Sequence, residues 1–136
     1  MQQAGWVGAV VIVAAAGIAG CQGSGDAAQA SCTFSGSTAG VSITVCEEVE
    51  GVTPADVGSL GPSCGVPPTD LVDGGAESSA QFMYGPCSRA GTIGGCRKMS
   101  GSVIITQWYY DDGTGRVTPP DVQMACTVSG GVFIQR

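Results

Sequence analysis

The side chains best suited to holding a ligand form one aromatic and acidic cluster, Trp108-Tyr109-Tyr110-Asp111-Asp112. Successive strand residues point to opposite faces, so Trp108 and Tyr110 are expected on one face and Tyr109 on the other. If the face with Trp108 and Tyr110 is exposed, its rings form a platform beside two carboxylates, which suits a sugar or a peptide. The competing interpretation, that these rings supply the core of a small domain, is favoured because aromatic side chains dominate core area.

Seven cysteines are the second chemical feature of the chain. Six of them follow Cys21, and if the domain is exported, this even number predicts a framework of up to three disulfides. Zinc would need close cysteine pairs and usually histidine, and the sequence has neither histidine nor C-x-x-C. The spacing does not choose among the many conceivable pairings. The cysteines expected in bridges are Cys32, Cys46, Cys64, Cys87, Cys96 and Cys126.

Carboxylates give weaker signals. Residues 111–115 (DDGTG) resemble part of a calcium loop but lack its spaced acidic series, so a polar turn is expected there. Glu47, Glu48 and Glu50 follow the β-branched run of residues 41–45, much as the two aspartates follow residues 103–110. A cation could bridge these two acidic ends if they converged. No metal or cofactor is predicted. Without histidine or G-x-S-x-G there is also no candidate catalytic residue, and an enzyme is not expected.

The composition describes the scaffold that must hold these side chains. The 136 residues include 23 glycines, only 12% are charged, and the net charge is −6. Many glycines and few charges favour turns and short strands over long helices. An acidic chain without a basic stripe is a poor partner for nucleic acid, which requires phosphate neutralisation.

Two segments resemble each other and suggest an internal repeat. Each runs from a cysteine through a β-branched stretch and a V-T-P-x-D-V hexad to a second cysteine, over residues 32–64 and 96–126. Each is predicted to be a β-hairpin followed by a short helix. Thr53 and Thr118 are the predicted N-caps, since each precedes a proline at the first helical position. Pro62 is expected to cut the first helix short.

These elements predict a small disulfide-rich α+β domain, with an antiparallel sheet of four to six short strands and two short helices. Residues 103–110 are apolar on both faces and are expected to form a central strand. A long surface loop is expected over residues 61–79. The other predicted strands lie at residues 41–45, 80–84, 91–99 and 132–135.

The start of the chain has a different character. Val7 to Ala19 is an apolar run too short to span a bilayer and typical of a signal peptide. It ends in Ile18-Ala19-Gly20-Cys21, which resembles the lipobox of bacterial prolipoproteins. The resemblance implies cleavage after Gly20 and a lipid on Cys21 that anchors the protein to a membrane. The domain resembles the uncharacterised cysteine-rich lipoproteins of bacteria in composition alone.

The expected organisation is a signal peptide over residues 1–20, a lipidated flexible tether over 21–30 and a cysteine-rich domain over 31–136. By the sorting rule known for enteric lipoproteins, Gln22 rather than Asp after Cys21 favours the outer over the inner membrane. The predicted function is a non-enzymatic interaction or structural module of the cell envelope, with an envelope protein as partner. The alternative is a module that binds carbohydrate or peptidoglycan through the platform around Trp108.

Overall fold

The fold is known from a computed structural model, which describes residues 28–38, 41–64 and 79–135. The expected signal peptide and Cys21 lie outside the described residues. The described part folds into six strands and two helices, in the order β1 (Ala28–Thr38), β2 (Val41–Val52), α1 (Pro54–Cys64), β3 (Ser79–Tyr84), β4 (Thr92–Ser100), β5 (Val103–Tyr110), α2 (Pro119–Val128) and β6 (Val132–Ile134).

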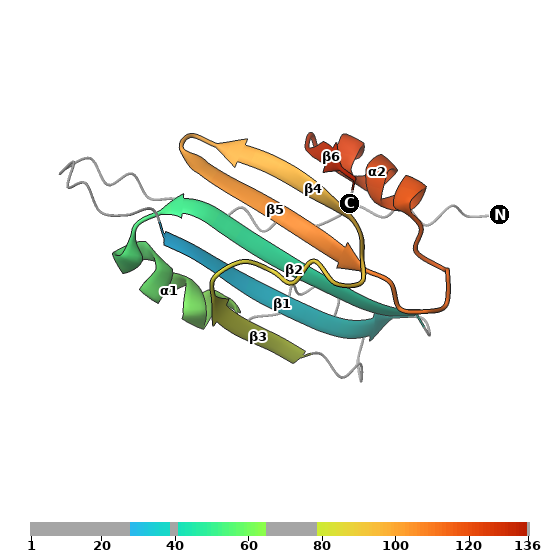
Figure 1. Cartoon of the computed structure of the whole chain (residues 1–136), viewed down its shortest axis with the longest axis horizontal. Coiled ribbons are helices and arrows are strands. Elements are labelled where there is room, and N and C mark those ends of the chain that lie inside the picture. The colour runs from blue at the N-terminus through green and yellow to red at the C-terminus, as the bar shows by residue number, and fades with distance from the viewer. Residues whose placement is uncertain (1–27, 39–40, 65–78, 136) are drawn as a thin grey trace.

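All six strands belong to one antiparallel sheet with the order β3-β1-β2-β5-β4-β6 (Figure 1). Two hairpins, β1–β2 and β4–β5, meet at the central β2–β5 pair. The strand that follows each helix returns to the outer edge of its own hairpin, β3 beside β1 and β6 beside β4. The predicted α+β class, the antiparallel sheet and the two helices are therefore confirmed.

The strand register separates the two faces of the sheet. Glu47 lies opposite Cys32 on one side and opposite Gln107 on the other, and Gln107 lies opposite Cys96. Side chains at paired positions share a face. Cys32 and Cys96 bond to the two helices, so both helices cover this face. Cys46 precedes Glu47 and therefore points to the opposite face.

The three predicted disulfides are present, and their pairing connects neighbouring elements. Cys32–Cys64 joins β1 to α1, and Cys96–Cys126 joins β4 to α2. Cys46–Cys87 joins β2 to the segment of residues 85–91 between β3 and β4, which we call the 85–91 loop. Each helix also packs on its own pair of outer strands, α1 on β1 and β3, and α2 on β4 and β6.

The helix starts follow the predicted chemistry. The carboxylate of Asp56 accepts hydrogen bonds from the backbone N–H and the hydroxyl of Thr53, at 3.3 and 2.6 Å. Asp121 accepts the same two bonds from Thr118. The helix dipole also stabilises a carboxylate in the first turn. Neither helix of the described residues is long and apolar enough to cross a membrane.

Three details differ from the sequence expectations. β1 begins at Ala28, so the last residues expected in the tether belong to the first strand. β1 and β2 have 11 and 12 residues, so these two strands are long rather than short. α1 continues past Pro62 to Cys64 because a proline in the last turn removes only its own N–H bond. Most of the expected surface loop, residues 65–78, lies outside the described residues.

Candidate functional site

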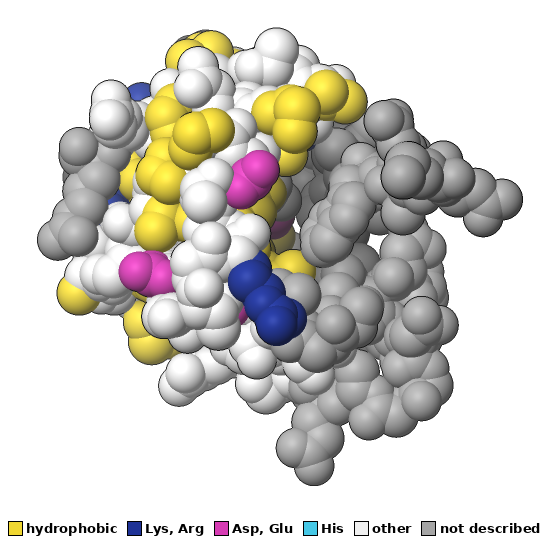
Figure 2. Space-filling model, turned by 90° about the vertical axis from the view of Figure 1, so that its right-hand side faces the viewer, with side chains coloured by type: hydrophobic (Ala, Val, Ile, Leu, Met, Phe, Trp, Pro, Cys, Tyr) yellow, Lys and Arg dark blue, Asp and Glu magenta, His cyan; other side chains and the backbone are white. Residues whose placement is uncertain are grey.

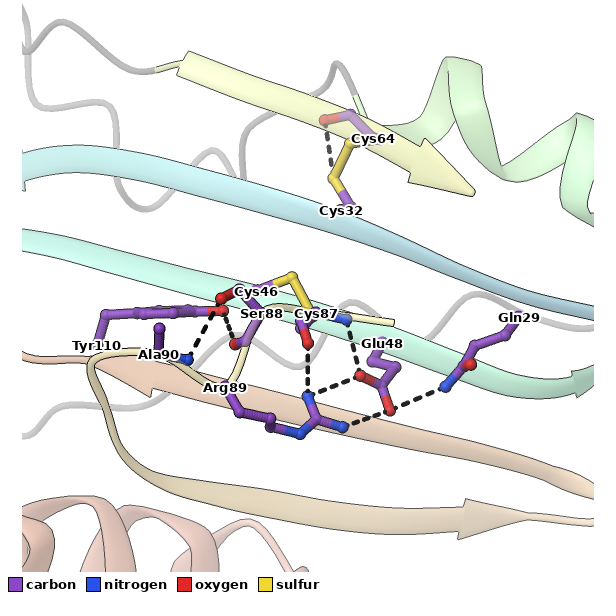
Figure 3. Close-up of a disulfide and its surroundings, with 10 residues drawn as sticks. All are labelled: Gln29, Cys32, Cys46, Glu48, Cys64, Cys87, Ser88, Arg89, Ala90 and Tyr110. Atoms are coloured by element: carbon purple, nitrogen blue, oxygen red, sulfur yellow. Dashed lines mark hydrogen bonds and ion pairs between the residues drawn. A yellow bond between two sulfur atoms is a disulfide. The ribbon is translucent and has the colours of Figure 1, made fainter. Parts of the chain in front are cut away.

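A cluster of charged, aromatic and disulfide-bonded side chains lies on the sheet face opposite the helices, under the 85–91 loop. Glu48 of β2 is its centre, and its side chain is 1% exposed. The guanidinium of Arg89 donates to both carboxylate oxygens, Nη1 to Oε2 at 2.8 Å and Nη2 to Oε1 at 3.0 Å. Cys87 N–H donates to Oε2 at 2.9 Å, and the amide of Gln29 donates to Oε1 at 3.1 Å (Figure 3).

Four donors on one carboxylate decide its ionisation. Burial alone raises the pKa of Glu48, because a carboxylate loses its hydration. The hydrogen bond and the positive charge of Arg89, together with the N–H of Cys87, act in the opposite direction and more than offset burial, so the pKa lies below its ordinary value. Glu48 is therefore an anion at neutral pH, and Arg89 is its counter-ion.

Trp108 and the Cys46–Cys87 disulfide complete the cluster. The Arg89 guanidinium carbon lies 4.0 Å from the centre of the Trp108 ring, which is a cation–π contact. Trp108 is 6% exposed and packs with Cys46 and Cys87. On the neighbouring strand Gly95 leaves room for the ring, since a Cβ there would lie 2.9 Å from Trp108 Cε3. The structure thus uses Trp108 as core.

Tyr110 also faces inward. Its hydroxyl donates to the carbonyl of Ser88 in the 85–91 loop at 2.6 Å. Burial, together with the charge of Glu48, raises the pKa of this phenol, although Arg89 acts in the opposite direction. Trp108 and Tyr110 do share a face, as the alternation predicts. The 85–91 loop lies over that face, so these two rings do not form an open platform.

The carboxylates expected beside the platform are used within their own turn. Asp111 accepts a hydrogen bond from the N–H of Gly113, and Asp112 accepts bonds from the N–H and hydroxyl of Thr114. The bonds from Thr114 lower the pKa of Asp112. The predicted polar turn is what the structure contains. Within the described residues, no three acidic, cysteine or histidine side chains gather as a metal site.

The other face carries a smaller polar pair. Glu47 accepts a hydrogen bond from the amide of Gln107 at 3.0 Å, across the β2–β5 pair and between the two helix-bearing sides of the sheet. Burial and the charge of Glu47 raise the pKa of the neighbouring Tyr109. Glu47 and Glu48 thus point to opposite faces, so the three glutamates of this strand do not act as one acidic group.

Sequence reasoning overlooked Glu48 and Arg89 as a pair. Two signals could have found them. Residues 31–90 contain seven acidic residues, and Arg89 is their one basic residue. Glu48 has the strand parity of Cys46, so a buried disulfide cysteine places Glu48 on a covered face and requires a partner for its charge.

Glu48, Arg89 and Tyr110 of this cluster bind one another or the 85–91 loop. Its carboxylate is neutralised, its disulfide is buried and its tyrosine donates to a backbone carbonyl. What the arrangement does is fix the 85–91 loop to the sheet by a covalent bond, an ion pair and a ring contact.

No protein-family model matches the chain, and neither the curated proteins nor the solved structures contain a match to it.

Proposed function

We propose that this chain is a lipid-anchored lipoprotein of the bacterial cell envelope, whose disulfide-stapled domain is a non-enzymatic interaction or structural module. The observation that carries the proposal is the cysteine pairing. The six cysteines after Cys21 form three bridges with one another, so a lipid on Cys21 competes with none of them. Stable disulfides belong to oxidising compartments such as the periplasm, which agrees with an exported chain.

The use of the polar groups supports a non-enzymatic module. Glu48, Arg89 and Tyr110 are each held by internal hydrogen bonds on the covered face. Catalytic groups usually stand in a cleft with a reacting atom within reach. Here the same groups hold the 85–91 loop in place, which is a structural task.

We also propose that the domain arose by duplication of a hairpin–helix–strand unit. The unit β1-β2-α1-β3 matches β4-β5-α2-β6 in order, pairing and disulfide position. One row across the sheet gives the correspondence residue by residue. It reads Phe82, Cys32, Glu47 from the first unit and Gln107, Cys96, Phe133 from the second.

Metabolic labelling with an alkyne fatty acid tests the anchor. In a Gram-negative host the wild-type chain should be labelled, and Cys21→Ser should not. Gln22→Asp is the matched variant for sorting: it should keep the label but move from the outer to the inner membrane fraction. An unlabelled wild type, or a label retained by Cys21→Ser, would refute lipidation at this residue.

A further inference from the structure

Within the part of the chain that the structure describes, the edge of the sheet formed by β3 lacks the usual protection against pairing. Among the described residues β3 has one hydrogen-bonded neighbour, β1, and five of its six residues are exposed. Its sequence SAQFMY contains no charge, no proline and no glycine, and its register with β1 has no bulge. Proteins normally guard an edge with a charge, a proline, a bulge, a covering loop or helix, or a very short strand. The opposite edge, β6, has only three residues.

The register shows which backbone groups face the open side. The N–H of Gly85 donates to the carbonyl of Gln29 at 2.9 Å, and these residues continue the register of Tyr84 opposite Ala30. In an antiparallel pair, hydrogen-bonded positions alternate along the strand. Every second residue back from Gly85 therefore bonds to β1. The N–H and C=O groups of Ala80, Phe82 and Tyr84 point outward.

We propose that two copies of this chain associate through β3, antiparallel about a two-fold axis at Phe82, into one continuous sheet. The outward residues then pair as Ala80 with Tyr84 of the second copy, Phe82 with its own equivalent, and Tyr84 with Ala80. Each pair exchanges two main-chain hydrogen bonds, through the N–H and C=O groups of β3 that point away from β1. The contact is isologous and closed, so it stops at a dimer.

Side-chain sizes fit this pairing. Tyr84 is 77% exposed, and it lies opposite the small side chain of Ala80 in the second copy. Its ring already touches Phe82 edge-on, with ring centres 5.2 Å apart. Phe82 is held in place from the helix side, where a Cβ on Gly61 of α1 would lie 3.7 Å from its ring. With no charged residue in β3, no like charges meet across the axis.

The helices also have room. α1 packs over β1 and β3, so its axis lies about 5 Å from the two-fold axis if strands are spaced by about 4.8 Å. The two copies of α1 would then run about 10 Å apart, which is an ordinary helix packing distance. The exposed residues of α1 are short, and they are Pro54, Ala55, Gly58, Ser59, Pro62 and Ser63.

Sedimentation velocity of the full chain in mild detergent, from about 1 to 100 µM, tests the dimer. Ala80→Pro removes one outward N–H without touching the bonds to β1, and proline is tolerated at such edge positions. It should weaken dimerisation by about tenfold or more. Ala80→Ser keeps the N–H and a small side chain at this position, and should dimerise like the wild type. A monomeric wild type throughout, or an Ala80→Pro dimer as tight as the wild type, would overturn the proposal.

If Ala80→Pro fails to fold, a second variant and a second measurement still test the dimer. Tyr84→Lys changes an exposed side chain, keeps the backbone, and should also weaken the dimer by about tenfold. In hydrogen exchange, the amides of Phe82 and Tyr84 should become protected as the concentration of wild type rises. Unchanged protection there in a dimeric sample would place the contact elsewhere and refute the proposal. Every variant retains Cys21, so the lipid is the same in all the samples compared.

Discussion

Glu48 is buried, which is rare for a glutamate. A carboxylate with 1% exposure is stable only because four donors surround it, and two of them come from one guanidinium. Arg89 itself is 45% exposed, so it keeps part of its hydration while it neutralises the buried charge. Of the two partners, Arg89 is thus partly hydrated and Glu48 is not, and the position of Arg89 is fixed by its contacts with Glu48 and Trp108.

Removal of Arg89 should therefore cost much more than removal of a surface base. Arg89→Ala leaves the Glu48 carboxylate buried without its cation, and we expect the free energy of unfolding to fall by about 2–4 kcal/mol. Arg97→Ala is the matched control: Arg97 contacts Glu50 at 3.9 Å with both partners partly exposed, and should cost less than about 1 kcal/mol. Urea unfolding measures both values. Equal losses would show that the Glu48 pair behaves as a surface ion pair.

The lowered pKa of Glu48 predicts how stability changes with pH. The group binds its proton less readily in the folded than in the unfolded chain, whose carboxyl has the ordinary value of 4.5. Its stabilising contribution is complete above that value and disappears as pH falls through the folded pKa. From about pH 6 to about pH 3, wild type should lose more unfolding free energy than Glu48→Gln. Parallel pH curves for the two proteins would contradict the assignment.

The two helices are built alike. Each begins at a threonine followed by proline, carries an aspartate that binds back to that threonine, and ends near a cysteine bonded to the first strand of its own hairpin. α2 has a second proline, Pro120, where α1 has Ala55. The second helical position needs no N–H partner, so proline fits there without loss.

The correspondence of the helices makes a specific prediction for Ala55→Pro. The substitution should raise the free energy of unfolding by about 0.4–1 kcal/mol, because it restricts the unfolded chain and suits the helix start. Ser59→Pro, one turn later in the same helix, should lower it by about 3 kcal/mol or more. Thermal and urea unfolding provide the comparison. A clear loss of stability in Ala55→Pro would mean that the starts of α1 and α2 are not equivalent.

Local chemistry predicted the elements better than it predicted their contacts. The strand Val103–Tyr110 and the start of α2 after Thr118 follow from β-branched runs and caps, which act within a few residues. The cysteine pairing and the Glu48–Arg89 pair depend on which strands become neighbours, and no local signal encodes that. Trp108 shows the same limit, because strand alternation gives its parity while the 85–91 loop decides its exposure.

At the scale of the whole molecule, a modest core is divided into parts that the disulfides hold together. Two bridges each attach one helix to the same face of the sheet, and the third attaches the 85–91 loop to the opposite face. They join residues 32, 41 and 30 positions apart, and loops of this length are stabilised by about 3–4 kcal/mol per bridge. That is comparable to the net stability of a small domain, so the fold depends on the bridges remaining oxidised.

Export, lipidation and three bridges together form the central claim, and one mass measurement tests all of them. The protein would be extracted from membranes, alkylated without reduction, and its intact mass recorded. We expect a chain that begins at Cys21, carries acyl groups and contains no alkylated cysteine. A chain that retains residues 1–20, lacks acyl groups or takes up the alkylating agent would contradict the account.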